Sequence, residues 1–355
     1  MGHPSTFLGI IIPPSHDLKG NLDDLRNFYH EFKVSDSRSL STPVGPTWTL
    51  KEWEGTAAHK ILISRLGGKK ELKPTSPIYA CFVGLSMGDH WAPALAQASH
   101  EELLRAHDAL RAEEELRFGV IPPRAPLGHY TGVCIDDKLS MQLIPKSKPE
   151  MPLRDHDACA NAAAAYDHAG LVVHEKKQVR RAEVFCAWGA EVEGVHGYCG
   201  AKRSRLAWLA VLTFKASRSR VLTRKLLDEL VGCWAFCLQF RRPLFSLIEL
   251  MYNEGPVSKG HTEPFRPSQA LRAEMQVLAL LGMTAMSQLR TQVGPTMYAT
   301  DASPDGAGAV SSTVEPGLAR EIARRAECRG FHTRLLPPIS AHLHEKGFVV
   351  DEDRK

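Results

Sequence analysis

The sequence contains no long uninterrupted hydrophobic run. Near the N-terminus the longest run, residues 7–12, ends at Pro13 and Pro14. It is too short for a signal-peptide core or a membrane span. Nothing later in the chain offers about 18 uncharged apolar residues in succession. We therefore expect a soluble protein with no membrane partner.

The chain also lacks paired cysteines. None of its eight cysteines forms a C-x-x-C pair, and such usage is typical of reduced thiols inside a cell. Apolar residues make up 43% and charged residues 24% of the 355 residues, which excludes a wholly disordered chain, a collagen and a coiled coil. We expect an intracellular protein, in the cytoplasm or the nucleus, that is not secreted.

Little net charge remains when the whole chain is summed: 44 Lys and Arg stand against 40 Asp and Glu, a net charge of +4. The distribution is uneven. Residues 176–245 hold 14 basic and five acidic residues, a net charge of +9, so the rest of the chain carries −5. Such a basic block suits a polyanion such as nucleic acid. A solvated helix face gives the same pattern, and charge alone leaves both interpretations open.

Hydrophobic patterns predict the order of the secondary-structure elements. Two short apolar runs within residues 130–144 flank Asp136 and Asp137, which predicts a β-hairpin with an acidic tip. A second hairpin is expected within residues 184–195. Helical patterns cover residues 91–116, 158–170, much of 203–253, and 269–289. Residues 43–53 resemble a loop, residues 78–85 a strand, and residues 297–310 two strands around a glycine-rich turn.

The order of these elements indicates the fold class. A mixed half is followed by a basic helical part and then by a new β element. Regular alternation of strand and helix is absent, which argues against a doubly wound parallel sheet. We expect an α+β fold in which an antiparallel sheet with packed helices precedes a helical module.

Three carboxylates are candidates for phosphoryl-transfer chemistry. Nucleotidyl transfer uses divalent metals, about 3.5–4 Å apart, that take hard oxygen ligands, chiefly from Asp. Asp136 and Asp137 at a hairpin tip would supply two such ligands, and Asp24 on a neighbouring strand is the candidate for the third. Each of these signals alone is more often a solvated turn.

Five short blocks, taken together, resemble the palm of reverse transcriptases (RNA-directed DNA polymerases), particularly those of retrotransposons. They are Asp24-Leu25-Arg26-Asn27-Phe28-Tyr29, Leu85-Ser86-Met87-Gly88-Asp89, Cys134-Ile135-Asp136-Asp137, Gly170-Leu171 followed by Lys176-Lys177, and Phe185-Cys186-Ala187-Trp188-Gly189. In this order they resemble the first palm motif, the turn that opens the next palm helix, the Tyr-x-Asp-Asp hairpin, the fourth motif and the primer grip. They cover roughly residues 20–195.

The resemblance implies a two-metal nucleotidyltransferase that extends a primer on an RNA or DNA template with dNTPs. Asp24 and Asp136 would bridge two Mg²⁺ ions, Asp137 would support them, and Lys177 would protonate the leaving pyrophosphate. Tyr29 would stack under the nucleotide sugar and exclude a 2′-hydroxyl.

Further residues would hold the nucleotide and the primer. Met87 and Gly88 would lie along the incoming nucleotide, and Trp188 and Gly189 would hold the primer end. The basic block would belong to a helical thumb that follows the template–primer backbone through non-specific phosphate contacts. Its candidate contacts are Lys202, Arg203, Arg205, Lys215, Arg218 and Arg220.

The C-terminal part resembles the beginning of a ribonuclease H-like domain. Residues 298–303 look like its first strand, with Asp301 as its first metal carboxylate. Only 54 residues follow Asp301, so we expect no working nuclease. The expected division is a palm with a remnant of fingers (1–200), a thumb (201–265), a helical connection (266–294) and a partial ribonuclease H-like domain (295–355).

The sequence departs from the family pattern at several places. Cys134 stands where an aromatic residue is expected and Ser86 where a proline is expected, although neither change removes a metal ligand. Only 23 residues precede Asp24, where the family places most of its fingers. Two alternatives therefore stay open: a catalytically inactive, nucleic-acid-binding remnant of a retroelement polymerase, and a host protein that reuses the palm for an unrelated interaction.

Overall fold

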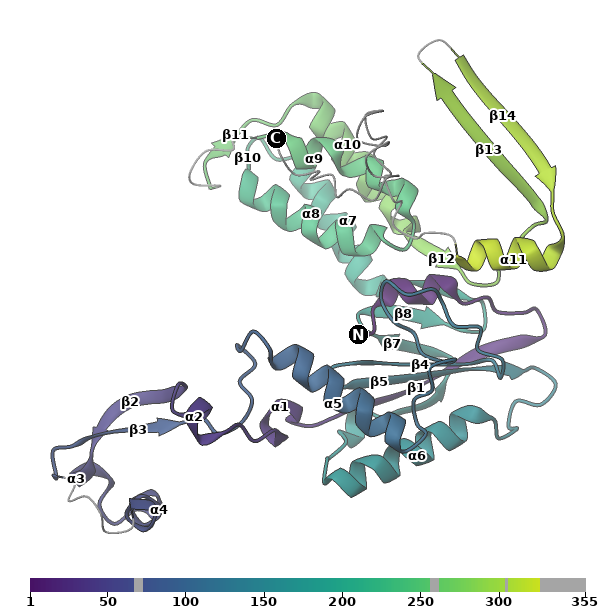
Figure 1. The fold of residues 1–355 in the computed structure, drawn as a ribbon. Helices are drawn as coiled ribbons and strands as arrows, with labels where there is room; N and C mark the ends of the chain where they lie inside the picture. Colours follow the sequence, from purple (N-terminus) through teal and green to yellow (C-terminus); the bar gives the residue numbers. More distant parts are fainter. Residues whose placement is uncertain (67–72, 256–261, 304–305, 326–355) are drawn as a thin grey trace, which may run out of the picture. The chain divides into compact units, whose positions relative to one another are not determined.

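The computed structural model describes residues 1–66, 73–255, 262–303 and 306–325 (Figure 1). The chain falls into two compact units, Met1–Gln292 and Val293–Lys355. The larger unit contains every candidate site residue except Asp301. As the sequence predicts, the protein has an α+β fold with antiparallel sheets.

The centre of the larger unit is a four-stranded antiparallel sheet in the order β4-β5-β1-β6. Its strands are β1 (His16–Asp24), β4 (His129–Cys134), β5 (Asp137–Pro145) and β6 (Val179–Ala182). β4 and β5 form the predicted hairpin around Asp136. β5 is buried at six of its nine positions, because the sheet is covered on both faces.

Helices α5 (Ala92–Ala106) and α6 (Arg154–Ala169) pack on one face of this sheet (Figure 1). α6 can approach closely because it buries the small residues Ala158, Ala162 and Ala165. It ends at Gly170, which has a φ of +68° and so takes the left-handed conformation that glycine adopts without strain. The helical pattern over residues 158–170 therefore predicts the end of α6 correctly.

A second antiparallel sheet has the order β12-β9-β8-β7. Its buried side chains belong to the larger hydrophobic core of this unit. Its strands are β7 (Val184–Ala187), β8 (Ala190–Glu193), β9 (Tyr198–Ala201) and β12 (Met286–Gln288). β7 and β8 are the second predicted hairpin. A methyl group on Gly194 would lie 1.7 Å from the carbonyl oxygen of Leu18, so only glycine allows this close approach to β1.

A helical module follows β9. Its elements are α7 (Arg203–Ser217), β10 (Leu222–Thr223), α8 (Arg224–Leu238), the 3-10 helix η3 (Arg242–Ile248), α9 (Glu249–Asn253), β11 (Pro264–Phe265), α10 (Gln269–Leu281) and the 3-10 helix η4 (Gly282–Thr284). Trp234 is fully buried in this module, and its indole N–H donates to the hydroxyl of Thr213 at 2.8 Å. The aromatic ring therefore fills the core while its one polar group stays paired.

Short elements occupy the remaining parts of the larger unit. They are η1 (Pro4–Gly9), α1 (Phe28–Glu31), α2 (Asp36–Ser39), β2 (Pro43–Thr49), α3 (Leu50–Trp53), α4 (Ala57–Leu66), β3 (Pro77–Cys81) and η2 (Glu175–Lys177). β2 pairs with β3, so the prediction of a loop over residues 43–53 is wrong. The valine, tryptophan and threonines of this stretch favour a strand despite its two prolines and its glycine.

Two helix predictions are too long at their C-terminal ends. α5 ends at Ala106, before Asp108 takes a φ of +56°, although the pattern of apolar residues continues to residue 116. α10 ends at Leu281, and the chain then forms β12, which pairs with β9. For α10, a pairing with a strand distant in the sequence decides where the helix ends.

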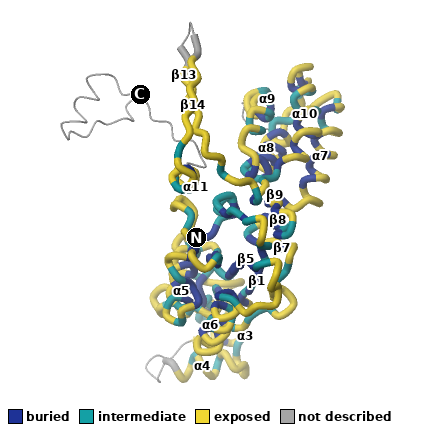
Figure 2. The backbone as a smooth tube through the Cα atoms, turned by 90° about the vertical axis from the view of Figure 1, so that its right-hand side faces the viewer, coloured by how far each residue is buried: buried dark blue, intermediate teal, exposed yellow. Residues whose placement is uncertain are grey.

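The smaller unit contains β13 (Thr296–Ser303), β14 (Gly306–Thr313) and α11 (Pro316–Arg325) among its described residues. β13 and β14 pair as the antiparallel hairpin that the glycine-rich pattern predicts. The described side chains of this hairpin are exposed on both faces (Figure 2). Three further carboxylates near the C-terminus, Asp351, Glu352 and Asp353, lie outside the described residues.

Candidate active site

Strand register brings three carboxylates to one end of the central sheet. Asp24, the last residue of β1, lies opposite Asp137, the first residue of β5. Asp136 lies in the turn between β4 and β5, and its carbonyl accepts a hydrogen bond from the N–H of Leu25 at 3.2 Å. The structure thus brings together the three aspartates that the sequence motifs single out.

The turn that carries Asp136 has an unusual backbone. Only Ile135 and Asp136 separate β4 from β5, and Ile135 has a φ of +59°. Two-residue hairpins favour glycine or asparagine at positions of positive φ. A β-branched residue in that conformation is strained, so contacts elsewhere must hold the turn.

Burial and like charge together raise the pKa values of the two hairpin aspartates. The pKa of Asp137 rises to about 6, mainly through burial and then through the charges of Asp136 and Asp24. The pKa of Asp136 is also raised, again chiefly by burial, with a further contribution from Asp24. Carboxylates crowded in this way repel each other, and a cation placed among them would relieve the repulsion.

Lys177 provides a positive charge beside this cluster. Its Nζ lies 2.7 Å from Oδ2 of Asp24, while its side chain remains 58% exposed. The hydrogen bond to Asp24 is the main reason why the pKa of Lys177 is raised, so the side chain stays an ammonium at neutral pH. The 3-10 helix η2 supplies this lysine, and the N–H of His174 just before it donates to the carbonyl of Asp24 at 2.7 Å.

A pocket of about 140 Å³ adjoins the carboxylates, lined by residues that include Asp24, Asp137, Lys177 and Trp188. It is also lined by Asp23 and Lys138, which are 3% and 1% exposed and which sequence reasoning missed. Asp23 accepts hydrogen bonds from Arg180 and Gln178. Nothing in the sequence distinguishes Asp23 from Asp24 as the buried member of the pair, because that follows from the strand register.

The chemical type of the three carboxylates suits a hard divalent cation. Mg²⁺ prefers oxygen ligands. Three aspartate carboxylates that repel each other would supply such ligands. Within the described part of the chain, no three His, Cys, Asp or Glu side chains already converge on one metal position. Lys177 lies against Oδ2 of Asp24, so that oxygen is shared with the ammonium group.

Tyr29 lies near the same cluster. Burial is the main cause of its raised pKa, and the charge of Asp136 is the next. Its carbonyl accepts from the N–H of Leu85 at 3.2 Å, which ties the first motif to the segment containing Met87 and Gly88. Met87 is 67% exposed, and a methyl group on Gly88 would meet no atom closer than 3.9 Å, so both face open space.

Trp188 packs inward at the second hairpin. Its ring stacks on Phe7 with centroids 5.2 Å apart, and a methyl group on Gly132 would lie 2.7 Å from the ring. Its indole Nε1 is buried and has no hydrogen-bond partner. Gly189 has a φ of +85° and lies against Phe236 of α8. These contacts give Trp188 a packing function under β4.

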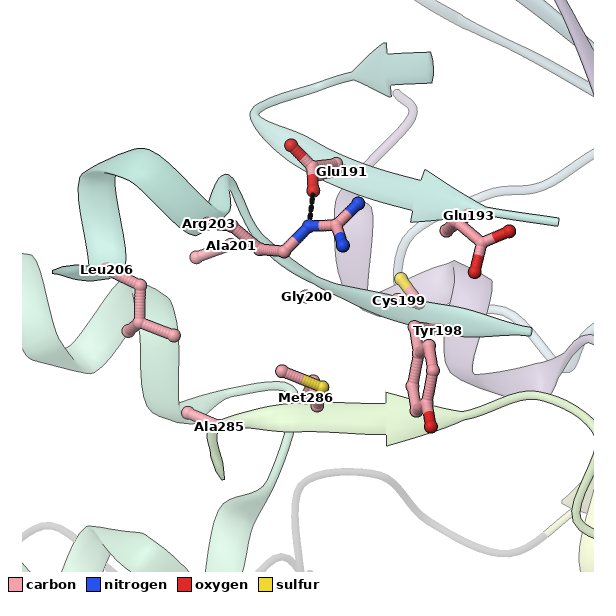
Figure 3. Close-up of a pocket in the computed structure, with 10 residues that line it drawn as sticks. All are labelled: Glu191, Glu193, Tyr198, Cys199, Gly200, Ala201, Arg203, Leu206, Ala285 and Met286. Atoms are coloured by element: carbon pink, nitrogen blue, oxygen red, sulfur yellow. Dashed lines mark hydrogen bonds and ion pairs between the residues drawn. The ribbon is translucent and has the colours of Figure 1, made fainter. Parts of the chain in front are cut away.

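The six basic candidates all lie on α7 or at its ends, and all are exposed. Arg203 is paired with Glu191 across a separate pocket of about 130 Å³ at the start of α7 (Figure 3). Arg205 lies over the ring of Phe236, 5.9 Å from its centroid. These two guanidinium groups therefore already have partners within the protein.

Asp301 lies on β13 of the smaller unit and is exposed. Its strand partner is Gly308.

Among the described residues, no helix is long and apolar enough to cross a membrane.

No family model and no curated protein matches this sequence. The solved structures that are similar to it include two foamy viral proteins. A foamy viral protease-reverse transcriptase dRH in complex with double-stranded DNA has a TM-score of 0.52 and 14% identity, covering 88% of this chain and 43% of that chain. The foamy viral protease-reverse transcriptase with double-stranded DNA has a TM-score of 0.50, again at 14% identity, over 88% of this chain and 51% of that chain.

The likeness concerns the fold. The chain has a reverse transcriptase-like fold, and it spans about half the length of the chains that it resembles.

Proposed function

We propose that this protein is an RNA-directed DNA polymerase of a retroelement, which extends a primer with dNTPs on an RNA or DNA template. One observation carries the proposal: β1 and the β4–β5 hairpin bring Asp24, Asp136 and Asp137 together within a reverse transcriptase-like fold. Proteins of unrelated function also share folds, so the argument rests on these carboxylates and their surroundings.

Asp24, Asp136 and Asp137 would hold two Mg²⁺ ions. When bound, such ions activate the primer 3′-hydroxyl and neutralise the charge of the pyrophosphate that leaves. Lys177, held as an ammonium next to Asp24, would donate a proton to that pyrophosphate. Tyr29, at the side of Asp136, would contact the nucleotide sugar, and the exposed Met87 and Gly88 would border the nucleotide.

The basic side chains of α7 and its ends would bind the template–primer. Lys202, Lys215, Arg218 and Arg220 are exposed and suited to phosphate contacts without sequence preference. Gly189 lies beside Phe236 of α8, so the predicted primer contact would adjoin the helical module.

Primer extension on poly(rA)/oligo(dT) with Mg²⁺ tests the proposal. We expect the wild-type chain to extend the primer and Asp136→Asn or Asp24→Asn to lose at least a hundredfold in rate. Removing a charged ligand costs more transition-state stabilisation than most single contacts do. Asp157→Asn, an exposed position of α6, is the matched control and should extend at the wild-type rate.

The alternative function gives a different result in the same experiment. A catalytically inactive remnant would bind the duplex in a salt-sensitive manner and extend no primer, whatever residue stands at position 136. A host protein with an unrelated interaction would show neither property.

A further inference from the structure

The strained turn at Ile135 is held by two buried polar side chains of α5. The N–H of Ile135 donates to Oε1 of Gln97 at 2.8 Å. The carbonyl of Ile135 lies 2.8 Å from Nδ1 of His100. Both backbone groups of the left-handed residue are therefore paired by one neighbouring helix.

Gln97 and His100 together are called the clamp below. Further contacts orient each of the two side chains. Nε2 of Gln97 donates to the carbonyl of Val133 at 3.0 Å and to Oε1 of Glu101 at 2.6 Å. Glu101 is in turn paired with Arg105 and Arg117. With its amide donating to these two oxygens, Gln97 must present its own oxygen to Ile135.

The tautomer of His100 follows from its partners. A carbonyl only accepts, so Nδ1 of His100 carries the proton that it donates to Ile135. Nε2 lies 3.0 Å from the hydroxyl of Tyr166 on α6, and it accepts from that hydroxyl in the neutral ring. His100 is 0% exposed and Tyr166 is 2% exposed. Water therefore does not reach these groups, and the loss of either hydrogen bond would leave a buried polar group unpaired.

We propose that His100, together with Gln97, is a positioning residue that holds Ile135 in the left-handed conformation. In this way it would place the carboxylates of Asp136 and Asp137 in the candidate active site. The proposal rests on the proposed function for its catalytic consequence, while the clamp itself is a statement about the hairpin. Neither side chain touches the reacting atoms; both act through the backbone of Ile135.

The left-handed conformation is unfavourable for a β-branched residue, and the two hydrogen bonds oppose that cost. Without them the turn can relax to a conformation with negative φ. Misplacing a catalytic group by about 1 Å can lower a rate a hundredfold. The decrease in rate would occur in the chemical step, and the affinity for the template–primer would stay unchanged.

A set of variants in the full chain tests the clamp. His100→Phe keeps an aromatic ring but loses both hydrogen bonds, whereas His100→Asn retains an amide donor at the position of Nδ1. His107→Phe is the control, because His107 lies next to the end of the same helix and its Nδ1 bonds only the local carbonyl of Leu103. Ile135→Gly removes the strain itself.

Amide hydrogen exchange followed by mass spectrometry gives the direct readout. In His100→Phe we expect residues 130–140 to exchange at least tenfold faster, while peptides of α8 keep wild-type protection. His100→Asn and His107→Phe should stay within about twofold of the wild type in both regions. If His100→Phe loosens the whole chain, His100→Asn decides: protection of residues 130–140 upholds the clamp, and exchange as fast as in His100→Phe overturns it.

Primer extension then tests the catalytic consequence. His100→Phe should lower kcat at least tenfold and leave KM for the template–primer within twofold, and adding Ile135→Gly should restore part of kcat. A wild-type kcat in His100→Phe, or no rescue by glycine, would overturn the positioning role. A wild-type chain that extends no primer contradicts the proposed function instead, and the exchange experiment still decides the clamp.

Discussion

At the scale of single residues, the candidate site combines groups that a sequence reveals with groups that it hides. Asp24, Asp136 and Asp137 stand in recognisable motifs, and strand register brings them together. His100 and Tyr166 stand in ordinary helical patterns. They become visible only when α5, α6 and the hairpin pack, because the contact between His100 and Tyr166 joins residues 66 positions apart.

His100 also makes the stability of the chain depend on pH. Burial lowers its pKa to about 4 from the usual 6.5, with the hydrogen bond to Ile135 opposing and the charge of Lys138 adding to the shift. Between these values the unfolded chain binds a proton that the folded chain does not, so the free energy of unfolding falls as the pH falls. The full effect is about 3 kcal/mol.

Urea unfolding from pH 7 to pH 4 measures this contribution. The wild-type chain should lose about 3 kcal/mol more stability over this interval than His100→Asn does. His129, which is also buried and whose pKa is also lowered, remains in both chains, so its contribution cancels. Parallel curves for the two chains would show that His100 is not buried in its neutral form.

At the scale of elements, the sequence predicts hairpins better than helix ends. The β4–β5 and β7–β8 hairpins are where the apolar runs place them, because each hairpin joins apolar runs that are neighbours in the sequence. The end of α10 is not where its pattern predicts, because β12 pairs with β9, 86 to 90 positions earlier in the sequence. A residue-by-residue pattern carries no information on such a partner.

One arginine ties this late strand region to the first strand. The guanidinium of Arg290, just after β12, pairs with Asp17 at 2.6 Å and donates to the carbonyls of Pro13, Gly194 and Val195. Arg290 and Asp17 are 18% and 21% exposed. Several charge-assisted bonds in a half-buried place contribute more than an exposed ion pair does.

Arg290→Ala should therefore lower the free energy of unfolding by about 2 kcal/mol, because four partners lose their donor together. Urea denaturation measures the change. Arg266→Ala, an exposed arginine before α10, should shift the stability by less than about 0.5 kcal/mol. Equal effects of the two substitutions would mean that Arg290 does not join β12 to β1.

At the scale of the whole molecule, the small net charge conceals a separation of charge. The acidic remainder includes the three carboxylates of the candidate site, and the +9 block includes α7. Sequence alone leaves a solvated helix face as an equal interpretation of that block, because only a binding experiment distinguishes exposed charge from charge that contacts phosphate.

The salt dependence of duplex binding makes this distinction. A plot of the logarithm of the association constant against the logarithm of the salt concentration has a negative slope. Exchanging Lys215 and Arg218 for glutamine should make this slope less steep by about 2, since each phosphate contact contributes about 0.9. Lys146→Gln with Lys148→Gln, in the segment that follows β5, removes the same charge from exposed positions and should leave the slope unchanged. Equal slopes for the two double variants would assign the basic residues of α7 to solvent.

Incorporation of a single nucleotide on a defined template tests the central claim most directly. The wild-type chain, with Mg²⁺ and one dNTP at a time, should add only the nucleotide complementary to the next template base. Asp136→Asn should lower this rate at least a hundredfold, and Asp157→Asn should not change it. Addition that ignores the template, or equal rates in the wild type and Asp136→Asn, would contradict a polymerase site built on the β4–β5 hairpin.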